Sequence, residues 1–372
     1  MHKHLIRLTP LRFLAAMCVV LFHFGRGIPP FDGSIPFDLP SNAGLAVSFF
    51  FCLSGLIMAS VYGGSAVAAR DYWIARFARI YPLYILAVVM TLVLGGGYPL
   101  HTILLNILML QAWVPGYPLA LNAPGWSLSV EAFFYAIFPF LIRWLSNGNI
   151  KRFAIISLCS WAVTQLFVSQ VFNDVDLMRK TQNVLNAFPS LHLNEFFLGA
   201  AAGALFTPIN EHRVGGHRFS TGALVLLSGI SVTYLMSGLC LQFGAAARSD
   251  MGSDAPVLVG IIWLIASAPA QWARVLDWQP LVTLGEASYA IYLLQLPART
   301  VFDVQLAPFT NRLSPTAHLY AYVAFLTALS LVVYLIIERP ARRWIKGRFQ
   351  ENEDAASPGA HARSAHQIVH AR

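Results

Sequence analysis

Charged residues are scarce in this sequence. Asp, Glu, Lys and Arg make up 11% of the 372 residues, whereas hydrophobic residues make up 57% and the mean hydropathy is +0.60. A chain so poor in charge cannot cover a water-facing surface, so the composition predicts an all-α polytopic membrane protein. No long polar block precedes the C-terminal tail, which excludes a separate soluble catalytic domain.

Several familiar signatures are also absent. The four cysteines lie apart from one another inside apolar runs, with no CxxC and no clustering with histidine, which is typical of small buried hydrophobic side chains. The sequence contains no GxSxG, Walker loop or HExxH, no carboxylate pair at glycosidase-like spacing and no internal repeat. These absences exclude the hydrolase and nucleotide-binding sites that such motifs build. We also expect no metal site.

Apolar segments long enough to cross a bilayer as helices, which takes about 20 residues, dominate the chain. We predict about ten spans, at residues 8–27, 43–62, 80–97, 126–145, 153–172, 191–207, 221–243, 255–272, 281–302 and 317–337. Residues 101–114 are apolar but shorter, which suits an interfacial or re-entrant piece. Residues 1–350 thus form one integral membrane domain, and the polar residues 351–372 are expected to be a disordered cytoplasmic tail.

The net charge of +8 does not indicate nucleic-acid binding, because the basic residues lie in short loops where they orient helices. Alternating the spans places most of the 25 Lys and Arg residues on one side of the membrane. The six exceptions are Arg26, Arg179, Lys180, Arg248, Arg299 and Arg312. This bias predicts that both termini are cytoplasmic and that the protein is a multi-pass protein of the cytoplasmic (inner) membrane.

The first span carries a charged residue, Arg12, and a titratable one, His23. At about 100° and 1.5 Å per residue, the two side chains share one helix face and lie about 16 Å apart along the axis. Such residues usually face the protein interior or a wet cavity, and a histidine can act as a general base near neutral pH. A snorkelling arginine and a structural histidine are the alternatives.

Arginine pairs and embedded carboxylates suggest further site residues. Arg76 and Arg79 lie three residues apart on one predicted face, and guanidinium groups bind phosphate bidentately. The alternative is that these two arginines only orient the helix in the membrane, as part of the positive-inside bias. Glu131 follows Ser127 and Ser129 within the first turns of its span, where a helix dipole stabilises its charge. A structural ion pair is the alternative interpretation of Glu131.

Three further groups of residues mark the later spans. His192, Asn194 and Glu195 lie at the outer end of their span, where they line an externally open cavity or are merely interfacial. Ser288, Tyr289, Tyr292 and Gln295 give one span a polar face, for which helix–helix hydrogen bonding is the simpler explanation. Gly203, Gly229 and Gly260 are expected to mark close helix packing.

Five motifs in order resemble those of the bacterial membrane acyltransferase-3 family, which comprises polysaccharide and antibiotic O-acyltransferases. Arg12 and His23 match its R-x10-H signature. The stretches SFFFCLSGLIM (48–58), RFARIYPLY (76–84), WSLSVEAFFY (126–135) and IERPARR (337–343) are similar to its FFxLSGF, RxxRIxPxY, WSLxxExxFY and ExPxR elements. One departure is SYAIYLLQ (288–295), where Gln295 replaces a histidine that many relatives have.

The resemblance implies acyl-CoA, with acetyl-CoA as the expected form, as co-substrate, with no permanent cofactor, and a sugar hydroxyl on an exported or lipid-linked glycan as acceptor. Catalysis is then expected from His23 and Glu131, with His23 as general base or as an acyl-histidine. Acyl-CoA is expected to meet Arg12, Arg76, Arg79 and Tyr84. The glycan or glycolipid acceptor is expected to meet Trp126, Ser127, Asn194 and Glu195, beside membrane lipid.

Two other classes of protein remain as alternatives. A polytopic transporter of a glycolipid or an organic acid would also have many spans and embedded charges, but it predicts inverted repeats that the sequence does not show. A membrane scaffold or sensor leaves the buried histidine and arginines unexplained. Transfer of label from acyl-CoA to glycan would separate the three.

Overall fold

The computed structural model describes residues 3–33, 43–63, 68–146, 148–173, 185–211, 216–242 and 251–356, and its regular elements there are helices. The first half contains α1 (Lys3–Ile6), α2 (Thr9–Phe24), α3 (Ala43–Tyr62), α4 (Ala69–Gly95), α5 (Leu100–Ile107), η2 (Gln111–Trp113), α6 (Gly125–Ser146) and α7 (Ile150–Asn173). The second half contains α9 (Leu193–Glu211), α10 (Gly216–Gln242), α11 (Ala255–Ala266), α12 (Ala270–Leu276), α13 (Gln279–Gln305), α14 (Ala307–Thr310), α15 (Pro315–Val333), η4 (Tyr334–Glu338) and α16 (Arg339–Ala356).

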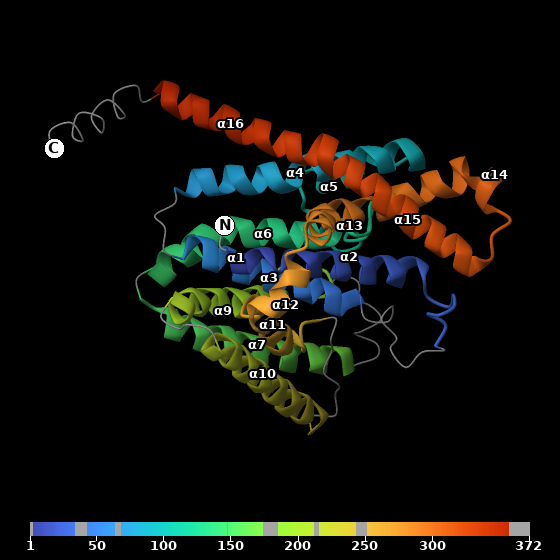
Figure 1. The fold of residues 1–372 in the computed structure, drawn as a ribbon. Helices are drawn as coiled ribbons and strands as arrows, with labels where there is room; N and C mark the ends of the chain where they lie inside the picture. The colour runs from blue at the N-terminus through green and yellow to red at the C-terminus, as the bar shows by residue number, and fades with distance from the viewer. Residues whose placement is uncertain are drawn as a thin grey trace.

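Each predicted span overlaps one of these helices, and the long helices run roughly along one common direction (Figure 1). Six helical segments of the described chain are long and apolar enough to cross a membrane: α3, α4, α6, α7, α10 and the continuous run Pro315–Phe349. The helices α2, α9 and α11 are apolar but shorter. The all-helical membrane architecture is therefore confirmed, whereas the count of ten spans and the cytoplasmic position of both termini stay predictions.

Two predicted boundaries were wrong. The helix α4 begins at Ala69 and not near residue 80, so Arg76, Arg79 and Pro82 lie well inside it. An apolar window misses this first part because the charged residues Arg70, Asp71, Arg76 and Arg79 lower its hydropathy. The helix α11 ends at Ala266 and not at residue 272, because Pro269 lacks the backbone N–H that would continue it.

The shorter apolar stretch at 101–114 forms the eight-residue α5 and the 3-10 turn η2, which is consistent with a piece too short to cross. At the other end of the chain, α16 continues beyond residue 351, where the tail was expected to begin, as far as Ala356. Residues 357–372 lie outside the described residues, so the disorder of the tail stays a prediction.

Glycines let the central helices meet backbone to backbone. The helix α3 packs along α9, and a Cβ at Gly203 would stand 2.2 Å from the Leu56 carbonyl oxygen. Across the pair α10 and α11, Cβ atoms at Gly229 and Gly260 would come within 2.3 and 2.5 Å of the facing backbone. The predicted role of Gly203, Gly229 and Gly260 is therefore confirmed.

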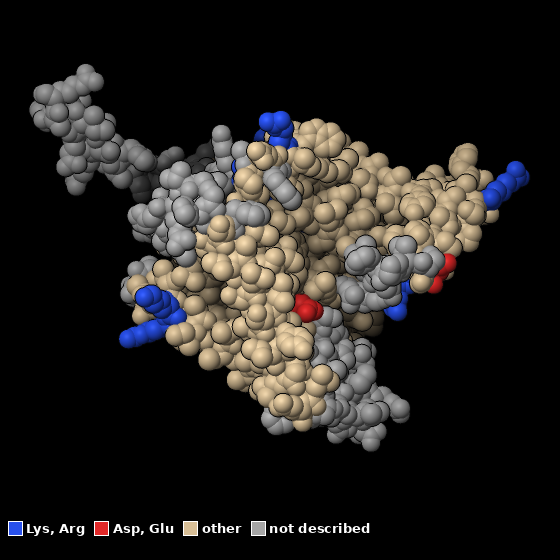
Figure 2. Space-filling model, turned by 60° about the horizontal axis from the view of Figure 1, so that its bottom comes forward, with Lys and Arg blue, Asp and Glu red and all other residues tan. Residues whose placement is uncertain are grey.

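The outer surface is poor in charge. On the face shown in Figure 2, Lys and Arg stand in a few places, mostly near the outline of the molecule, and uncharged residues cover most of the described surface. Many large apolar side chains of the described residues are exposed, among them Leu235 on α10 and Phe140 on α6. A broad exposed apolar belt is what lipid contact requires of a protein whose helices cross the bilayer.

Candidate active site

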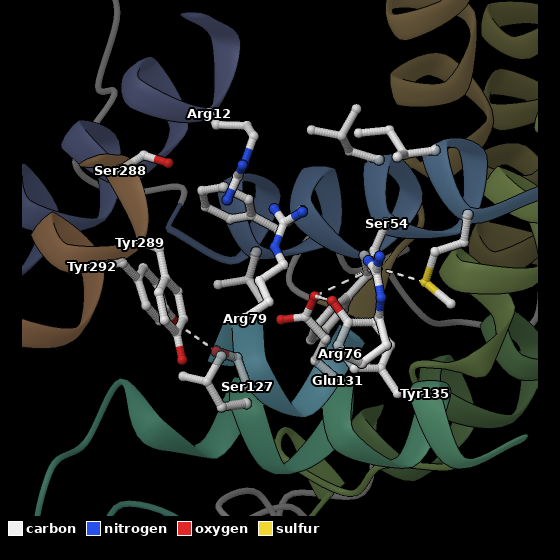
Figure 3. A pocket seen from close by; sticks show the side chains of 17 residues that line it. Arg12, Ser54, Arg76, Arg79, Ser127, Glu131, Tyr135, Ser288, Tyr289 and Tyr292 are labelled. Atoms are coloured by element: carbon white, nitrogen blue, oxygen red, sulfur yellow. Dashed lines mark hydrogen bonds between the residues drawn. The ribbon is translucent and has the colours of Figure 1, made fainter. Parts of the chain in front are cut away.

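A cavity opens between α2, α3, α4, α6 and α13, and charged and hydroxyl side chains line it beside apolar ones (Figure 3). Its volume is about 710 Å³, counting the part that is open to solvent. The polar lining consists of Arg12, Ser54, Arg76, Arg79, Ser127, Glu131, Tyr135, Ser288, Tyr289 and Tyr292. Four of the five sequence motifs therefore contribute side chains to one cavity. Examples are Arg12, Ser54, Arg79 and Glu131, one from each motif.

Two guanidinium groups face each other across this cavity. Arg12 reaches in from α2 and Arg79 from α4, and their charged ends point toward one another (Figure 3). Within the described residues, neither forms a hydrogen bond or a salt bridge, and each acts electrostatically on the other. Like charges held this close repel unless an anion lies between them, so the pair is suited to bind a phosphate or carboxylate.

Arg76 differs from Arg79, although both line the cavity as the sequence predicts. The Arg76 Nη2 donates a hydrogen bond of 2.9 Å to the Tyr62 hydroxyl. Its guanidinium lies 5.6, 5.7 and 5.7 Å from the ring centres of Tyr62, Tyr72 and Tyr135. Arg76 is therefore held in a cage of tyrosine rings, whereas the donors of Arg79 remain available to a ligand.

Glu131 supplies a carboxylate to the same cavity. It accepts hydrogen bonds from the Tyr135 hydroxyl, one turn further along α6, and from Ser54 Oγ at 3.4 Å. Its charge also acts on Arg12. The two hydroxyls orient the carboxylate, and its negative charge partly balances the arginines that surround it.

A second carboxylate, Glu338, interacts electrostatically with the same arginines but does not line the cavity. It ends the π-helical turn η4, is 5% exposed, and its Oε2 has no hydrogen-bond partner among the described residues. The charges of Arg12 and Arg79 act on it. In the sequence, Glu338 was marked only by the motif IERPARR. That motif does not predict the π-helical turn, a feature that is frequent at functional sites.

The polar face of α13 borders the cavity. Ser288, Tyr289 and Tyr292 line it, with the Tyr292 hydroxyl 2.8 Å from Ser127 Oγ and the Tyr289 hydroxyl donating to the Ile80 carbonyl at 2.8 Å. These residues were flagged by their helical spacing but not expected to be site residues. The structure shows that part of this face does lie at the site.

His23 lies outside the residues that line the cavity. Its Nδ1 is 2.8 Å from Oε1 of Gln295, and the residue is otherwise exposed near the end of α2. Arg12 borders the cavity beside Ser288 of α13, and Gln295 belongs to the same helix. The predicted common face of Arg12 and His23 is therefore the face that packs against α13, although the cavity reaches only the arginine.

Two other predicted site residues support the site from outside. The Tyr84 hydroxyl is buried, donates to the Asn106 carbonyl at 2.8 Å and accepts from Gln111 Nε2 at 3.0 Å. The half-buried Trp126 packs its ring 5.3 Å from the ring of His192. Neither lines the cavity, so the contact of Tyr84 with acyl-CoA and of Trp126 with an acceptor stay predictions.

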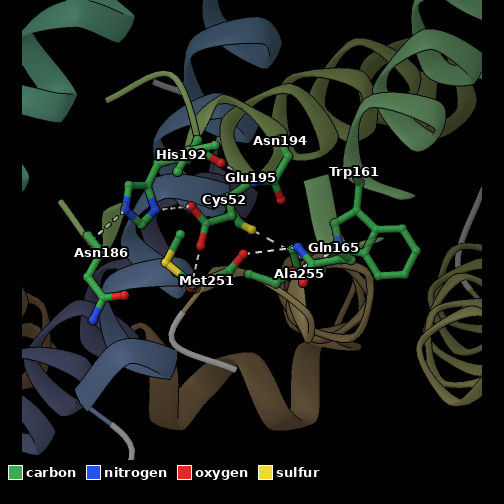
Figure 4. A network of polar contacts seen from close by, with 12 residues as sticks. Cys52, Trp161, Gln165, Asn186, His192, Asn194, Glu195, Met251 and Ala255 are labelled. Atoms are coloured by element: carbon green, nitrogen blue, oxygen red, sulfur yellow. Dashed lines mark hydrogen bonds and ion pairs between the residues drawn. The ribbon is translucent and has the colours of Figure 1, made fainter. Parts of the chain in front are cut away.

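Asn194 and Glu195 do not line an open cavity in this structure, because they are 1% and 0% exposed (Figure 4). Glu195 pairs with His192 Nδ1 at 2.8 Å and accepts from Ser48, while Asn194 donates to the Leu191 carbonyl. Their polar atoms are engaged in a network between α3 and α9. Acceptor binding by these two residues stays a prediction, and their observed contacts are internal.

Among the residues that the structure describes, no group of three or more His, Cys, Asp or Glu side chains lies close enough to hold a metal ion. The polar groups that line the cavity are guanidinium, carboxylate and hydroxyl groups, and the imidazole of His23 lies outside it, at the end of α2.

Comparisons with known proteins agree with the motifs. A family model described as "Acyltransferase domain" matches residues 6–335. Acyltransferase MdmB of Streptomyces mycarofaciens is 29% identical over 77% of this chain and 77% of its own length. The exopolysaccharide production protein ExoZ of Rhizobium meliloti is 25% identical, over 80% and 89% of the two chains.

The putative peptidoglycan O-acetyltransferase YrhL of Bacillus subtilis is 24% identical over 92% of this chain, which spans only 55% of that longer protein. No solved structure matches the chain at a significant level. Since the family match covers nearly the whole described bundle, the chain belongs to the acyltransferase-3 family and is a multi-pass membrane acyltransferase.

Proposed function

We propose that this protein transfers an acyl group, most simply acetyl, from acyl-CoA to a sugar hydroxyl of an exported or lipid-linked polysaccharide or oligosaccharide. The observation that carries the proposal is the pair of facing guanidinium groups, Arg12 and Arg79, whose donors are unoccupied in a cavity of about 710 Å³. Such a pair is suited to an anionic ligand, and the phosphates of coenzyme A provide one.

The donor part of the proposal assigns different tasks to the arginines. Arg12 and Arg79 bind phosphate oxygens through their free donors, while Arg76 contributes charge from its fixed position among the tyrosines. Glu131, oriented by Tyr135 and Ser54, holds Arg12 toward the ligand and keeps the cavity from becoming too positive when it is empty. This electrostatic task is what we propose for Glu131 in catalysis.

His23 is the proposed general base. Its imidazole takes the proton of the sugar hydroxyl as the sugar oxygen attacks the thioester carbon, and the proton then passes to the departing thiolate of coenzyme A. Alternatively, His23 attacks the thioester first and carries the acyl group to the sugar as an acyl-histidine. In either case the thioester end of acyl-CoA must reach the end of α2 while its phosphates stay in the cavity, along the face of α13 that links Ser288 to Gln295.

The acceptor class is proposed from the relatives. Two of them are named for peptidoglycan O-acetylation and exopolysaccharide production, both of which concern extracellular glycans. Ser127 reaches the cavity and is the best placed of the predicted acceptor contacts, since its hydroxyl pairs with Tyr292. We place the protein in the cytoplasmic membrane, where acyl-CoA on one side and an exported glycan on the other are both accessible.

The test uses the purified full chain in lipid nanodiscs with radiolabelled acetyl-CoA and extracted cell-surface glycan. We expect label in the glycan, and we expect Arg12→Gln and Arg79→Gln to weaken equilibrium binding of coenzyme A at least about tenfold. Arg152→Gln is the matched control, since it removes one positive charge at an exposed position and should bind normally.

Unchanged coenzyme A binding in both cavity variants would refute the assignment of the donor site. Passage of labelled glycolipid across vesicle membranes without any acyl transfer would instead favour the transporter alternative.

A further inference from the structure

We infer that Gln295 is a positioning residue that fixes the tautomer of His23, keeping the proton on Nδ1 and leaving Nε2 as the nitrogen with the free lone pair. The inference rests on the proposed role of His23 as the base. It assigns a task to Gln295, a residue at which the sequence departs from the pattern of many relatives.

The orientation of the Gln295 amide follows from its partners. Its Nε2 donates to the backbone carbonyl of Tyr292 at 2.8 Å. A carbonyl oxygen can only accept a hydrogen bond, so the NH2 group must be on that side and Oε1 on the other. Rotating the amide by half a turn would place two oxygens against each other.

The orientation of the amide decides the tautomer of the imidazole. Oε1 of Gln295 lies 2.8 Å from His23 Nδ1, and an amide oxygen can only accept. His23 must therefore carry a hydrogen on Nδ1 in both its neutral and its charged form. In the neutral form, Nε2 is then the nitrogen that can receive a proton from a substrate hydroxyl.

Gln295 is itself held firmly. It is 0% exposed, and its backbone carbonyl accepts a hydrogen bond from the Tyr322 hydroxyl on α15. The ring of Tyr322 packs 5.0 Å from the ring of Phe24, the neighbour of His23. Three helices, α2, α13 and α15, therefore fix the relative positions of the amide and the imidazole.

The partners of the ring are uncharged acceptors, the Gln295 amide and the backbone carbonyl of Val19 one turn earlier in α2, and the charged groups around this end of α2 pair elsewhere. Arg299 and Asp303 on α13 pair with each other at 2.6 Å, and His318 on α15 lies 3.6 Å from Asp303. Arg26 lies over the ring of Phe22, 5.3 Å away. Within the described residues no carboxylate contacts His23, so an uncharged acceptor orients it without neutralising the imidazolium that forms during catalysis.

The primary measurement is the 15N NMR spectrum of histidine side chains in the full chain, in nanodiscs, with the His23 signals assigned by comparison with His23→Ala. We expect protonated Nδ1 and unprotonated Nε2 in the neutral wild-type ring. In Gln295→Met, which keeps the length of the side chain but not the acceptor, we expect a mixture of tautomers. Wild-type protein with its proton on Nε2, or an unchanged tautomer in Gln295→Met, would overturn the inference.

Activity provides the second readout. Gln295→Met should lose at least about tenfold in the rate of acyl transfer, with little change in KM for acetyl-CoA. Gln295→Glu, with its second oxygen turned away from the Tyr292 carbonyl, keeps an acceptor on Nδ1, so it should retain the tautomer, and its added negative charge should shift the acid limb of the pH–rate profile to higher pH. Gln295→His also offers one donor and one acceptor and should preserve the tautomer.

The matched control is Gln165→Met, which removes another buried amide whose Nε2 donates to a backbone carbonyl, that of Met251 at 3.0 Å. It should leave both the His23 tautomer and the pH–rate profile unchanged. A shifted tautomer in Gln295→Met together with full transfer activity would leave the inference standing and refute the general-base role of His23, so the two failures are distinguishable.

Discussion

Arg76 donates a hydrogen bond to the Tyr62 hydroxyl at 2.9 Å, whereas Arg79, one turn further along the same helix, has no such partner among the described residues. Two arginines of one motif therefore face the same cavity in different states. One is fixed by the protein, and the other is free to bind a ligand.

The first prediction separates these two states. Arg79→Gln should raise KM for acetyl-CoA about tenfold or more and leave the melting temperature nearly unchanged, because it removes donors that the protein itself does not use. Arg76→Gln should lower the melting temperature, because cation–π contact with buried tyrosines contributes about 2 kcal/mol. Thermal unfolding and steady-state kinetics on both variants check this. Equal effects of both substitutions on KM and melting would contradict it.

The second prediction concerns Glu131. Glu131→Gln keeps an acceptor for Tyr135 and Ser54 but removes the negative charge that acts on Arg12. We expect the rate of acyl transfer to fall about tenfold or more while the protein stays folded. Ser54→Ala serves as the control, since it loses only the weaker contact of 3.4 Å and should keep most of the activity. Wild-type turnover by Glu131→Gln would show that its charge is dispensable.

The third prediction tests the buried network of Glu195. Removing one partner of a buried pair costs about 3–5 kcal/mol, so Glu195→Gln should clearly lower the melting temperature. Asp303→Asn breaks the exposed pair with Arg299 and should cost at most about 1 kcal/mol. If Glu195→Gln keeps its stability and instead raises KM for the glycan, the sequence prediction of acceptor binding would hold.

The fourth prediction concerns the contact between α3 and α9. A methyl group at Gly203 would stand 2.2 Å from the Leu56 carbonyl oxygen, so Gly203→Ala must push two backbones apart. We expect a loss of about 1–3 kcal/mol and less protein in the membrane. Gly238→Ala in α10 is the matched control, because no atom outside the helix lies within 4 Å of its added methyl group. Both are compared by thermal unfolding and by immunoblotting of membranes, and similar losses in both would rule out the packing explanation.

Local sequence patterns were enough to predict much of the helical architecture. The predicted span 43–62 has the bounds of α3, and the common face of Arg12 and His23 follows from the period of one helix. The start of α4 was missed because a hydropathy pattern excludes charged residues such as Arg70 and Asp71, even where a helix continues through them. The helix α11 ends three residues before Pro269, a helix breaker within the apolar run on which the span 255–272 is based.

The sequence by itself determined that the chain is a bundle of apolar helices with arginines and one histidine on inward faces, because helix period and hydrophobicity are local properties. Only the tertiary structure decided which of these groups have partners. Glu338 meets the charges of Arg12 and Arg79, and Gln295 meets His23, 272 residues away along the chain. Contacts between such distant segments depend on how the helices pack together, and no local pattern records that packing.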